Sequence, residues 1–264
     1  MKKYQSKKIA LVLGGGSARG LAHIGVLKVL KRNKIPVDVV VGTSIGSLIG
    51  AIYALGISLK KVEDIAIKTR WWHLTDFAIS KIGLIEGLNL QNIIKDVLED
   101  KGFNDTRKPL YVVTTDIENG EEVVLSSGNL TKAIKASCSV PGIFIPTRID
   151  GRLLVDGGLR SSVPTDVAKK LGADFIIAVD VGFCVKKGKI TNIFQAVFQA
   201  MQIIGSELNK HEARHSNLLI KVRLKEDMDQ MAFNRAKEII DFGEKAAEEM
   251  IPALKTAMKD EGYK

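Results

Sequence analysis

One pentapeptide in this sequence has the spacing of a nucleophilic serine. Gly42–Gly46 reads GTSIG, the pattern G-x-S-x-G with Ser44 at its centre. In a nucleophile elbow a strand ends, the serine occupies a strained turn, and a helix begins at once. Glycines flank the serine because bulk there would collide with the strand and the helix. Such a serine can attack an ester carbonyl, and the dipole at the helix N-terminus favours the developing negative charge.

The segments on either side of this pentapeptide have the composition that an elbow requires. Val37–Val41 is an apolar run typical of a buried strand, and Ile45–Leu55 is rich in Ala, Ile and Leu, as expected of a buried helix. The alternative interpretation is a glycine-rich turn between strand and helix in which the serine is incidental.

A second glycine-rich stretch, Gly14–Gly20 (GGGSARG), follows another apolar run and precedes a predicted helix. Counted from Gly14 or from Gly15, the glycines do not match the spacing G-x-G-x-x-G of a dinucleotide-binding loop. Leu21 occupies the position at which a phosphate-binding loop has lysine. The loop still offers backbone N–H groups at the start of a helix, and these can donate hydrogen bonds to an oxyanion. Arg19 could brace this loop or meet a phosphate.

A third element is Asp156-Gly157-Gly158. Taken alone, an aspartate before two glycines is most simply a turn. A histidine base is the alternative to a carboxylate base, and the chain holds His23, His73, His211 and His215. An ordinary α/β-hydrolase has its histidine near the C-terminus. His211 and His215 are spaced i, i+4 on a charged helix that we expect to be exposed, and His23 is expected to be structural.

The elements that must position these residues alternate between strand and helix, which predicts an α/β layered fold. Asn129 is expected to cap a helix, and Pro164 to lie in the first turn of another. The predicted strands are 9–13, 37–41, 110–116, 122–125, 175–181 and 218–222. The predicted helices are 21–30, 45–55, 130–137, 165–171, 193–210 and 235–258.

Composition places the chain among ordinary globular proteins. It has 264 residues, of which 45% are hydrophobic and 26% charged. The net charge of +9 is spread along the chain without clustered aromatics, so we expect no nucleic-acid partner, and an anionic lipid surface is the better candidate. Cys138 and Cys184 form neither a metal-ligand pair nor a disulfide framework, and are expected to be reduced and mostly buried.

Two apolar segments bear on location and substrate. The run Ile9–Leu13 is too short for a signal peptide, and no run reaches the length of a membrane span, so we expect a cytoplasmic protein that could touch membranes peripherally. Trp71–Gly87 is irregular and apolar. It is predicted either to cover the core or to form an apolar wall or lid for an acyl chain.

The three motifs occur in an order that resembles the patatin-like phospholipase family. Leu21–Leu27 (LAHIGVL) and Ala136–Gly142 (ASCSVPG) also look like that family. The resemblance runs from about residue 8 to about 182. It implies a three-layer α/β/α fold with a mostly parallel central sheet. No linker is evident, so we predict one patatin-like domain over 1–264, with a helical C-terminal part over about 190–264.

The resemblance also implies an activity: hydrolysis of fatty-acyl esters of phospholipids, lysophospholipids or related lipids through an acyl-enzyme, without cofactor or metal. Ser44 would be the nucleophile and Asp156 the base of a dyad, and Asp-Gly-Gly departs mildly from the Asp-Gly-Ala of many members. The residues that would surround the dyad are the oxyanion loop (Gly14, Gly15, Gly16, Ser17, Arg19, Gly20), the elbow glycines (Gly42, Gly46) and the base-motif glycines (Gly157, Gly158).

Two other functions compete with this one: a nucleotide or dinucleotide binder, and a non-catalytic lipid-binding or regulatory protein on the same fold. Intact Ser44, Asp156 and glycine loop argue against the second, because a pure binder has no use for a strained serine. The sequence leaves open the natural lipid, its chain length and cleaved position, the oligomeric state, and the role of the C-terminal helices.

Overall fold

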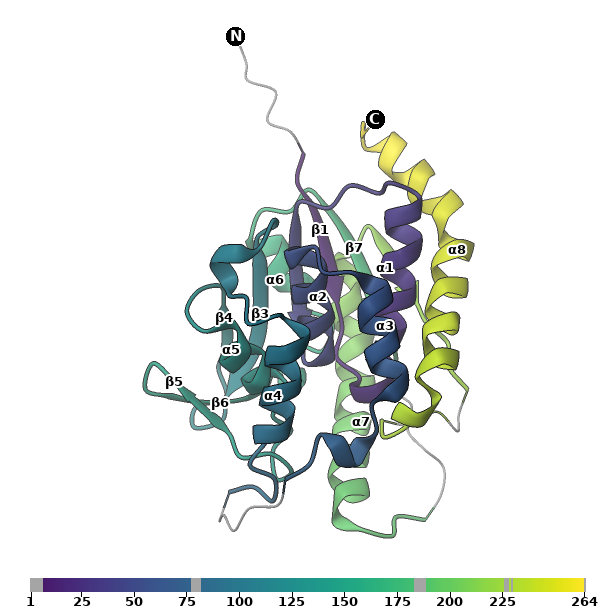
Figure 1. Ribbon diagram of the computed structural model, residues 1–264. Coiled ribbons are helices and arrows are strands. Elements are labelled where there is room, and N and C mark those ends of the chain that lie inside the picture. The colour runs from purple at the N-terminus through teal and green to yellow at the C-terminus, as the bar shows by residue number, and fades with distance from the viewer. Residues whose placement is uncertain (1–6, 77–81, 183–188, 226–227, 229, 264) are drawn as a thin grey trace.

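A single eight-stranded sheet organises the chain (Figure 1). The computed structural model describes residues 7–76, 82–182, 189–225, 228 and 230–263. Along the sheet the strands follow the order β5-β6-β3-β2-β1-β7-β8, with β4 pairing beside β3. The strands are β1 (Ile9–Leu13), β2 (Val39–Thr43), β3 (Leu110–Asp116), β4 (Glu122–Leu125), β5 (Thr147–Ile149), β6 (Arg152–Asp156), β7 (Phe175–Asp180) and β8 (Leu218–Lys221).

The sheet is parallel through its middle and antiparallel at one side. Strands β3, β2, β1, β7 and β8 pair in parallel, while β4 and β6 pair antiparallel with β3, and β5 with β6. This arrangement confirms the predicted α/β fold with a mostly parallel central sheet. The sequence analysis did not predict β5 and β6, which extend the sheet at its antiparallel side.

Eight α-helices surround the sheet in the part of the chain that the structure describes. They are α1 (Ala22–Arg32), α2 (Ile45–Leu55), α3 (Leu59–Lys68), α4 (Leu88–Val97), α5 (Leu130–Ser137), α6 (Thr165–Lys170), α7 (Ile193–Glu212) and α8 (Ala236–Asp260). Helices α3 and α4 were not predicted. Asn129 caps α5 as predicted, accepting a hydrogen bond from Lys132 N at 2.8 Å, whereas Pro164 occupies the N-cap of α6 rather than its first turn.

The two faces of the sheet are covered by different helices, which gives the three layers. Because side chains alternate along a strand, Ile9, Leu11 and Leu13 of β1 join the large core beneath α1–α5 and α8. Ala10 and Val12 face the opposite way, into a smaller core that includes residues of α6. The fold class predicted from the sequence is therefore confirmed. No helix among the described residues has both the length and the apolarity needed to cross a membrane.

Helices α1 and α8 lie side by side on one flank of the molecule (Figure 1). Glycine makes this approach possible on both helices. A Cβ atom on Gly25 would stand 2.1 Å from the Ile240 carbonyl oxygen, and one on Gly243 would stand 2.0 Å from the Ala22 carbonyl oxygen. Both distances are far below van der Waals contact, so the helix backbones touch directly.

Replacing Gly243 by alanine is expected to destabilise the protein. Helix propensity alone favours alanine by about 1 kcal/mol, but separating α1 from α8 should cost about 1–3 kcal/mol or more. Urea unfolding followed by circular dichroism should show a lower midpoint for Gly243→Ala. Glu249→Ala, on the exposed side of the same helix, is the control and should unfold near the wild-type midpoint. A Gly243→Ala protein more stable than wild type would contradict the close packing.

Candidate active site

Ser44 occupies a strained turn between β2 and α2. Its backbone angles are φ 53° and ψ −129°, in a region that non-glycine residues rarely adopt. The flanking glycines permit the turn: a Cβ on Gly42 would stand 2.6 Å from the Gly46 carbonyl oxygen, and one on Gly46 would stand 2.2 Å from the Leu13 carbonyl oxygen. The G-x-S-x-G segment therefore has the geometry of a nucleophile elbow.

Strand register brings Asp156 to the level of Ser44. Thr43 of β2 pairs with Val113 of β3, and the next residue of β3, Thr114, pairs with Asp156 at the end of β6. The side chains of Ser44 and Asp156 thus meet over β3, which lies between their strands. Gly157 allows the close passage of the chain there, because a Cβ atom on it would stand 2.4 Å from the Val113 carbonyl oxygen.

The two side chains form a short hydrogen bond. Ser44 Oγ donates to Asp156 Oδ2 at 2.7 Å, and Gly158 N donates to Asp156 Oδ1 at 2.8 Å. Ser44 is 8% exposed and Asp156 only 3% exposed. Both carboxylate oxygens therefore have a donor, and one of the two donors is the candidate nucleophile.

Burial changes the acidity of this carboxyl group. Desolvation raises the pKa of Asp156 to about 6, against the opposing effect of the hydrogen bonds from Gly158 and Ser44. A carboxylate with this pKa is a better proton acceptor near neutrality than an ordinary aspartate. Cys138 lies beside the pair, and burial together with the Asp156 charge raises the pKa of its thiol, which stays protonated.

Ser137 fixes the backbone of the elbow. Its hydroxyl accepts a hydrogen bond from Ser44 N at 2.7 Å and donates to the Val113 carbonyl oxygen at 2.6 Å. The motif Ala136–Gly142 was recognised in the sequence, but this role was not predicted, because it depends on the contact between α5, β3 and the elbow.

Some backbone N–H groups of the glycine loop already donate hydrogen bonds to carbonyl oxygens of the protein. Gly14 N donates to the Val179 carbonyl oxygen, Gly15 N to that of Ser162, and Arg19 N to that of Gly16. Gly20 packs against the elbow helix, where a Cβ atom would stand 2.0 Å from Ile45 Cγ2. In the described part of the chain, no acceptor bonds the N–H groups of Gly16 and Ser17, both of which lie beside Ser44.

Arg19 and His23 support this loop from the protein interior. Arg19 is buried, and its Nε donates to the Val181 carbonyl oxygen at 3.2 Å, so it braces the loop against the end of β7. His23 is fully buried and lies 2.8 Å through Nε2 from the Gly14 carbonyl oxygen. Because a carbonyl only accepts, Nε2 carries the proton. Burial lowers the pKa of His23 to about 4, so the ring is neutral near pH 7.

Two other histidines with described side chains contact residues outside the Ser44 and Asp156 pair. His73 accepts a hydrogen bond from Arg70 N, and His215 lies 3.0 Å from Asp166. The side chain of His211 is outside the described part of the structure, as is Cys184. Among the described residues, no cluster of three or more His, Cys, Asp and Glu side chains could hold a metal ion.

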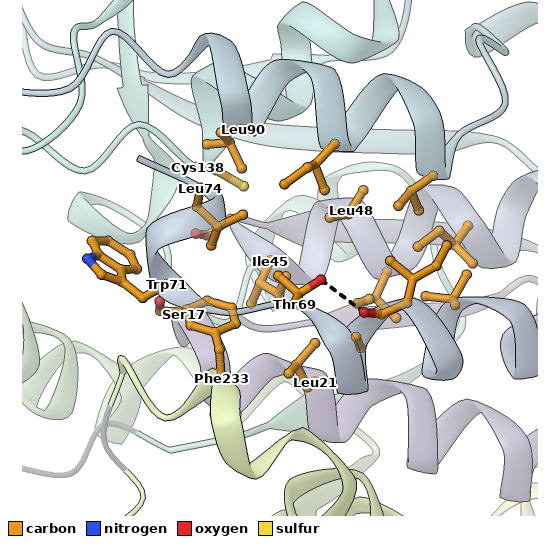
Figure 2. A pocket seen from close by; sticks show the side chains of 18 of the residues that line it. Ser17, Leu21, Ile45, Leu48, Thr69, Trp71, Leu74, Leu90, Cys138 and Phe233 are labelled. Carbon is orange, nitrogen blue, oxygen red and sulfur yellow. Dashed lines mark hydrogen bonds between the residues drawn. The ribbon is translucent and has the colours of Figure 1, made fainter. Parts of the chain in front are cut away.

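An apolar cavity opens beside Ser44 (Figure 2). Its walls come from α2, α3, α4, the region around Cys138, and two parts of the chain beyond residue 182: Phe198 of α7 and Phe233 just before α8. Figure 2 shows Trp71, Leu74 and Phe233 around the cavity. Trp71 packs against Phe144, Phe198 and Phe233 with ring centroids 6.0–6.4 Å apart.

The segment Trp71–Gly87 contributes both to the wall of this cavity and to the main core. Trp71 and Leu74 line the cavity, as the predicted apolar wall requires. Phe77 and Ile79, which the same prediction included, lie outside the described residues. Ile85 is fully buried in the main core, so the segment also covers the core.

Comparison with known proteins agrees with this geometry. Residues 11–169 match the family model described as patatin-like phospholipase. The chain belongs to the patatin-like phospholipase family. It is 41% identical over 187 residues to the patatin-like phospholipase domain-containing protein ZK370.4 of Caenorhabditis elegans, and 37% identical over 182 residues to the lysophospholipase nte1 of Aspergillus fumigatus.

These alignments cover 66–67% of this chain and only 12–14% of the two relatives. Among solved structures, the type III effector protein ExoU matches with a TM-score of 0.52 at 13% identity. That match covers 93% of this chain and 52% of the ExoU chain. It supports the patatin-like fold over nearly the whole length of the chain.

The buried Asp156 carboxylate leads to a prediction about stability and pH. Its pKa is raised from 3.8 to about 6 in the folded state, so ionisation opposes folding above pH 6 and has no such effect below 3.8. Asp156→Asn should therefore be more stable than wild type at pH 8, by up to about 3 kcal/mol. The difference should shrink as the pH falls from 6 to 4.

Urea unfolding of both proteins at pH 8, 6 and 4 measures this difference. The same variant should lose ester hydrolysis, since an amide cannot accept the Ser44 proton. A stability difference that does not change with pH would show that the carboxyl group has an ordinary pKa. Ser127→Ala, at an exposed side chain that does not titrate, is the control, and its stability relative to wild type should not change with pH.

Proposed function

We propose that this chain is a serine hydrolase that cleaves fatty-acyl esters of phospholipids, lysophospholipids or related lipids through an acyl-enzyme. The hydrogen bond between Ser44 Oγ and Asp156 Oδ2, at 2.7 Å in a buried setting, carries the proposal. It joins a hydroxyl held at a strained turn to a carboxylate whose pKa is raised. Family membership supports a lipid ester hydrolase in general, and the dyad and the substrates are our inference.

The reaction follows from this geometry in two stages. Ser44 Oγ attacks the ester carbonyl carbon while its proton passes to Asp156 Oδ2. The C–O bond to the alcohol then breaks, and the leaving oxygen takes the proton from Asp156. Water next attacks the acyl-enzyme with Asp156 again as base, which releases the fatty acid and restores Ser44.

Negative charge on the carbonyl oxygen must be stabilised during both stages. The predicted donors were the backbone N–H groups of the Gly14–Gly20 loop. Because an N–H that already has an acceptor cannot serve an oxyanion, we narrow the proposal to Gly16 and Ser17. The other members of the loop hold these two in place, together with the braces formed by Arg19 and His23.

The apolar cavity fits the acyl chain. It begins at Ser44 and follows α2, where Ile45, Ile49 and Ile52 line it in succession. Ile52 lies eight residues beyond Ser44, or about 12 Å along the helix axis. A cavity with almost entirely apolar walls favours a hydrocarbon chain and disfavours a nucleotide. Contact with an anionic membrane stays a prediction from the net charge.

The reaction class is tested first with a p-nitrophenyl octanoate assay on wild type and Ser44→Ala. We expect the variant to lose at least 10³-fold in kcat, since the nucleophile is gone. Ser127→Ala, at an exposed serine, is the matched control and should keep wild-type activity. A fluorophosphonate probe should also label Ser44 in the wild type and nothing in Ser44→Ala.

Equal turnover by wild type and Ser44→Ala would remove this serine from the mechanism. No turnover and no labelling in either protein would instead favour a non-catalytic lipid-binding protein.

The role of the cavity is tested by narrowing its far part. Ile52→Phe should lower kcat/KM for p-nitrophenyl hexadecanoate relative to p-nitrophenyl octanoate by about tenfold, because only the longer chain reaches this position. Overpacking should cost about 1–3 kcal/mol of stability, which thermal unfolding will monitor. Ile203→Phe, at a residue of α7 that is 54% exposed, is the control. An unchanged chain-length preference in Ile52→Phe would show that the acyl chain lies elsewhere.

A further inference from the structure

A second, smaller pocket meets the apolar cavity at Ser44. It measures about 40 Å³, and the two spaces share Ser17, Ser44, Val140 and Phe198. Asp156 lines the smaller pocket and is absent from the residues that line the cavity. The two candidate catalytic side chains therefore lie where the apolar cavity meets a smaller pocket that also has polar residues in its walls.

The position of the base decides which part of the substrate enters which space. Asp156 must return the proton to the alcohol oxygen as the C–O bond breaks, so that oxygen has to lie within its reach. The acyl chain fills the apolar cavity. The alcohol part then extends into the smaller pocket, on the Asp156 side of Ser44.

Two buried glutamines line this smaller pocket, and both come from the part of the chain beyond residue 182. Gln202 of α7 is 2% exposed, and Gln230, in the connection between β8 and α8, is 7% exposed. Asp156 is the only charged side chain that lines the pocket among the described residues. Neutral amides beside one carboxylate suit an uncharged, oxygen-bearing group better than an anion.

Gln230 has a donor without an acceptor. Its Nε2 is buried and has no hydrogen-bond partner in the described part of the structure. Its backbone is fixed against the glycine loop, because its carbonyl oxygen accepts from Ser17 Oγ at 2.8 Å and from Ala18 N at 3.2 Å. A buried N–H without an acceptor costs free energy. A substrate oxygen in the pocket would be such an acceptor.

We propose that Gln230 binds the alcohol part of the substrate by donating a hydrogen bond from its side-chain amide to a hydroxyl oxygen. The preferred alcohol is a polyol such as glycerol, whose free hydroxyl groups adjoin the ester. This inference rests on the proposed function, since it assigns one side of the same site. Gln230 is a binding residue for the alcohol, and the oxyanion donors remain Gly16 and Ser17.

The test compares two esters that differ only in these hydroxyl groups: 1-octanoylglycerol and propyl octanoate. The measured quantity is the ratio of their kcat/KM values. Gln230→Leu should lower this ratio about tenfold, which corresponds to the loss of one neutral hydrogen bond. Gln91→Leu makes the same change on α4, outside both pockets, and should leave the ratio as in wild type. Gln230→Met serves as a second variant if Gln230→Leu does not fold.

The outcomes separate this inference from the proposed function. A ratio unchanged in Gln230→Leu and Gln230→Met, with wild type active on both esters, would overturn the role of Gln230 alone. An equal loss of about 10²-fold on both esters would make Gln230 an oxyanion donor and would also overturn it. Wild type that hydrolyses only propyl octanoate would exclude a polyol site. Wild type inactive on these esters and on p-nitrophenyl octanoate would remove the proposed function, and this inference with it.

Discussion

The hydrogen bond between Ser44 and Asp156 is the constraint on which the rest of the site depends. A carboxylate buried this deeply resists ionisation, and among the described residues its two donors are Gly158 N and the serine hydroxyl. Further donors would stabilise the charge and lower the pKa, which would weaken the base. The site therefore combines a dry setting with few hydrogen bonds, which raises the pKa of the aspartate toward neutrality, as the proposed role of Asp156 as the base requires.

That pair exists only because backbone segments pass one another closely. Ser44 holds a strained conformation, and the strain is offset by close contacts that Gly42 and Gly46 alone permit. Gly157 does the same where the chain turns after Asp156. Ser137 then holds the N–H of the serine. Conformational strain, glycine packing and one buried hydroxyl thus act together to keep two oxygens 2.7 Å apart across an intervening strand.

The C-terminal part of the chain completes the site, although no recognisable motif lies there. Phe198 and Phe233 help to wall the apolar cavity, and the Gln230 carbonyl holds the glycine loop through Ser17 and Ala18. The sequence left open whether these helices cover the site, pair with a second chain or lie on a membrane. Residues of α7 and of the connection before α8 line the two pockets beside Ser44, so this part of the chain covers the site. The direct packing of α8 on α1 anchors this part to the helix that follows the glycine loop.

The sequence by itself determined the elbow, the alternation of strands and helices, and the fold class, because glycine spacing and apolar periodicity are local signals. Strands β5 and β6 and helices α3 and α4 were not predicted, although α3 and α4 are amphipathic and bury one face. Only the tertiary structure decided which loop N–H groups remain free, because Gly14 and Gly15 find acceptors on segments more than 140 residues away. It also brought Gln230 beside Ser44. Contacts between distant segments leave no periodic trace in a sequence, since each depends on how the whole sheet and its helices pack.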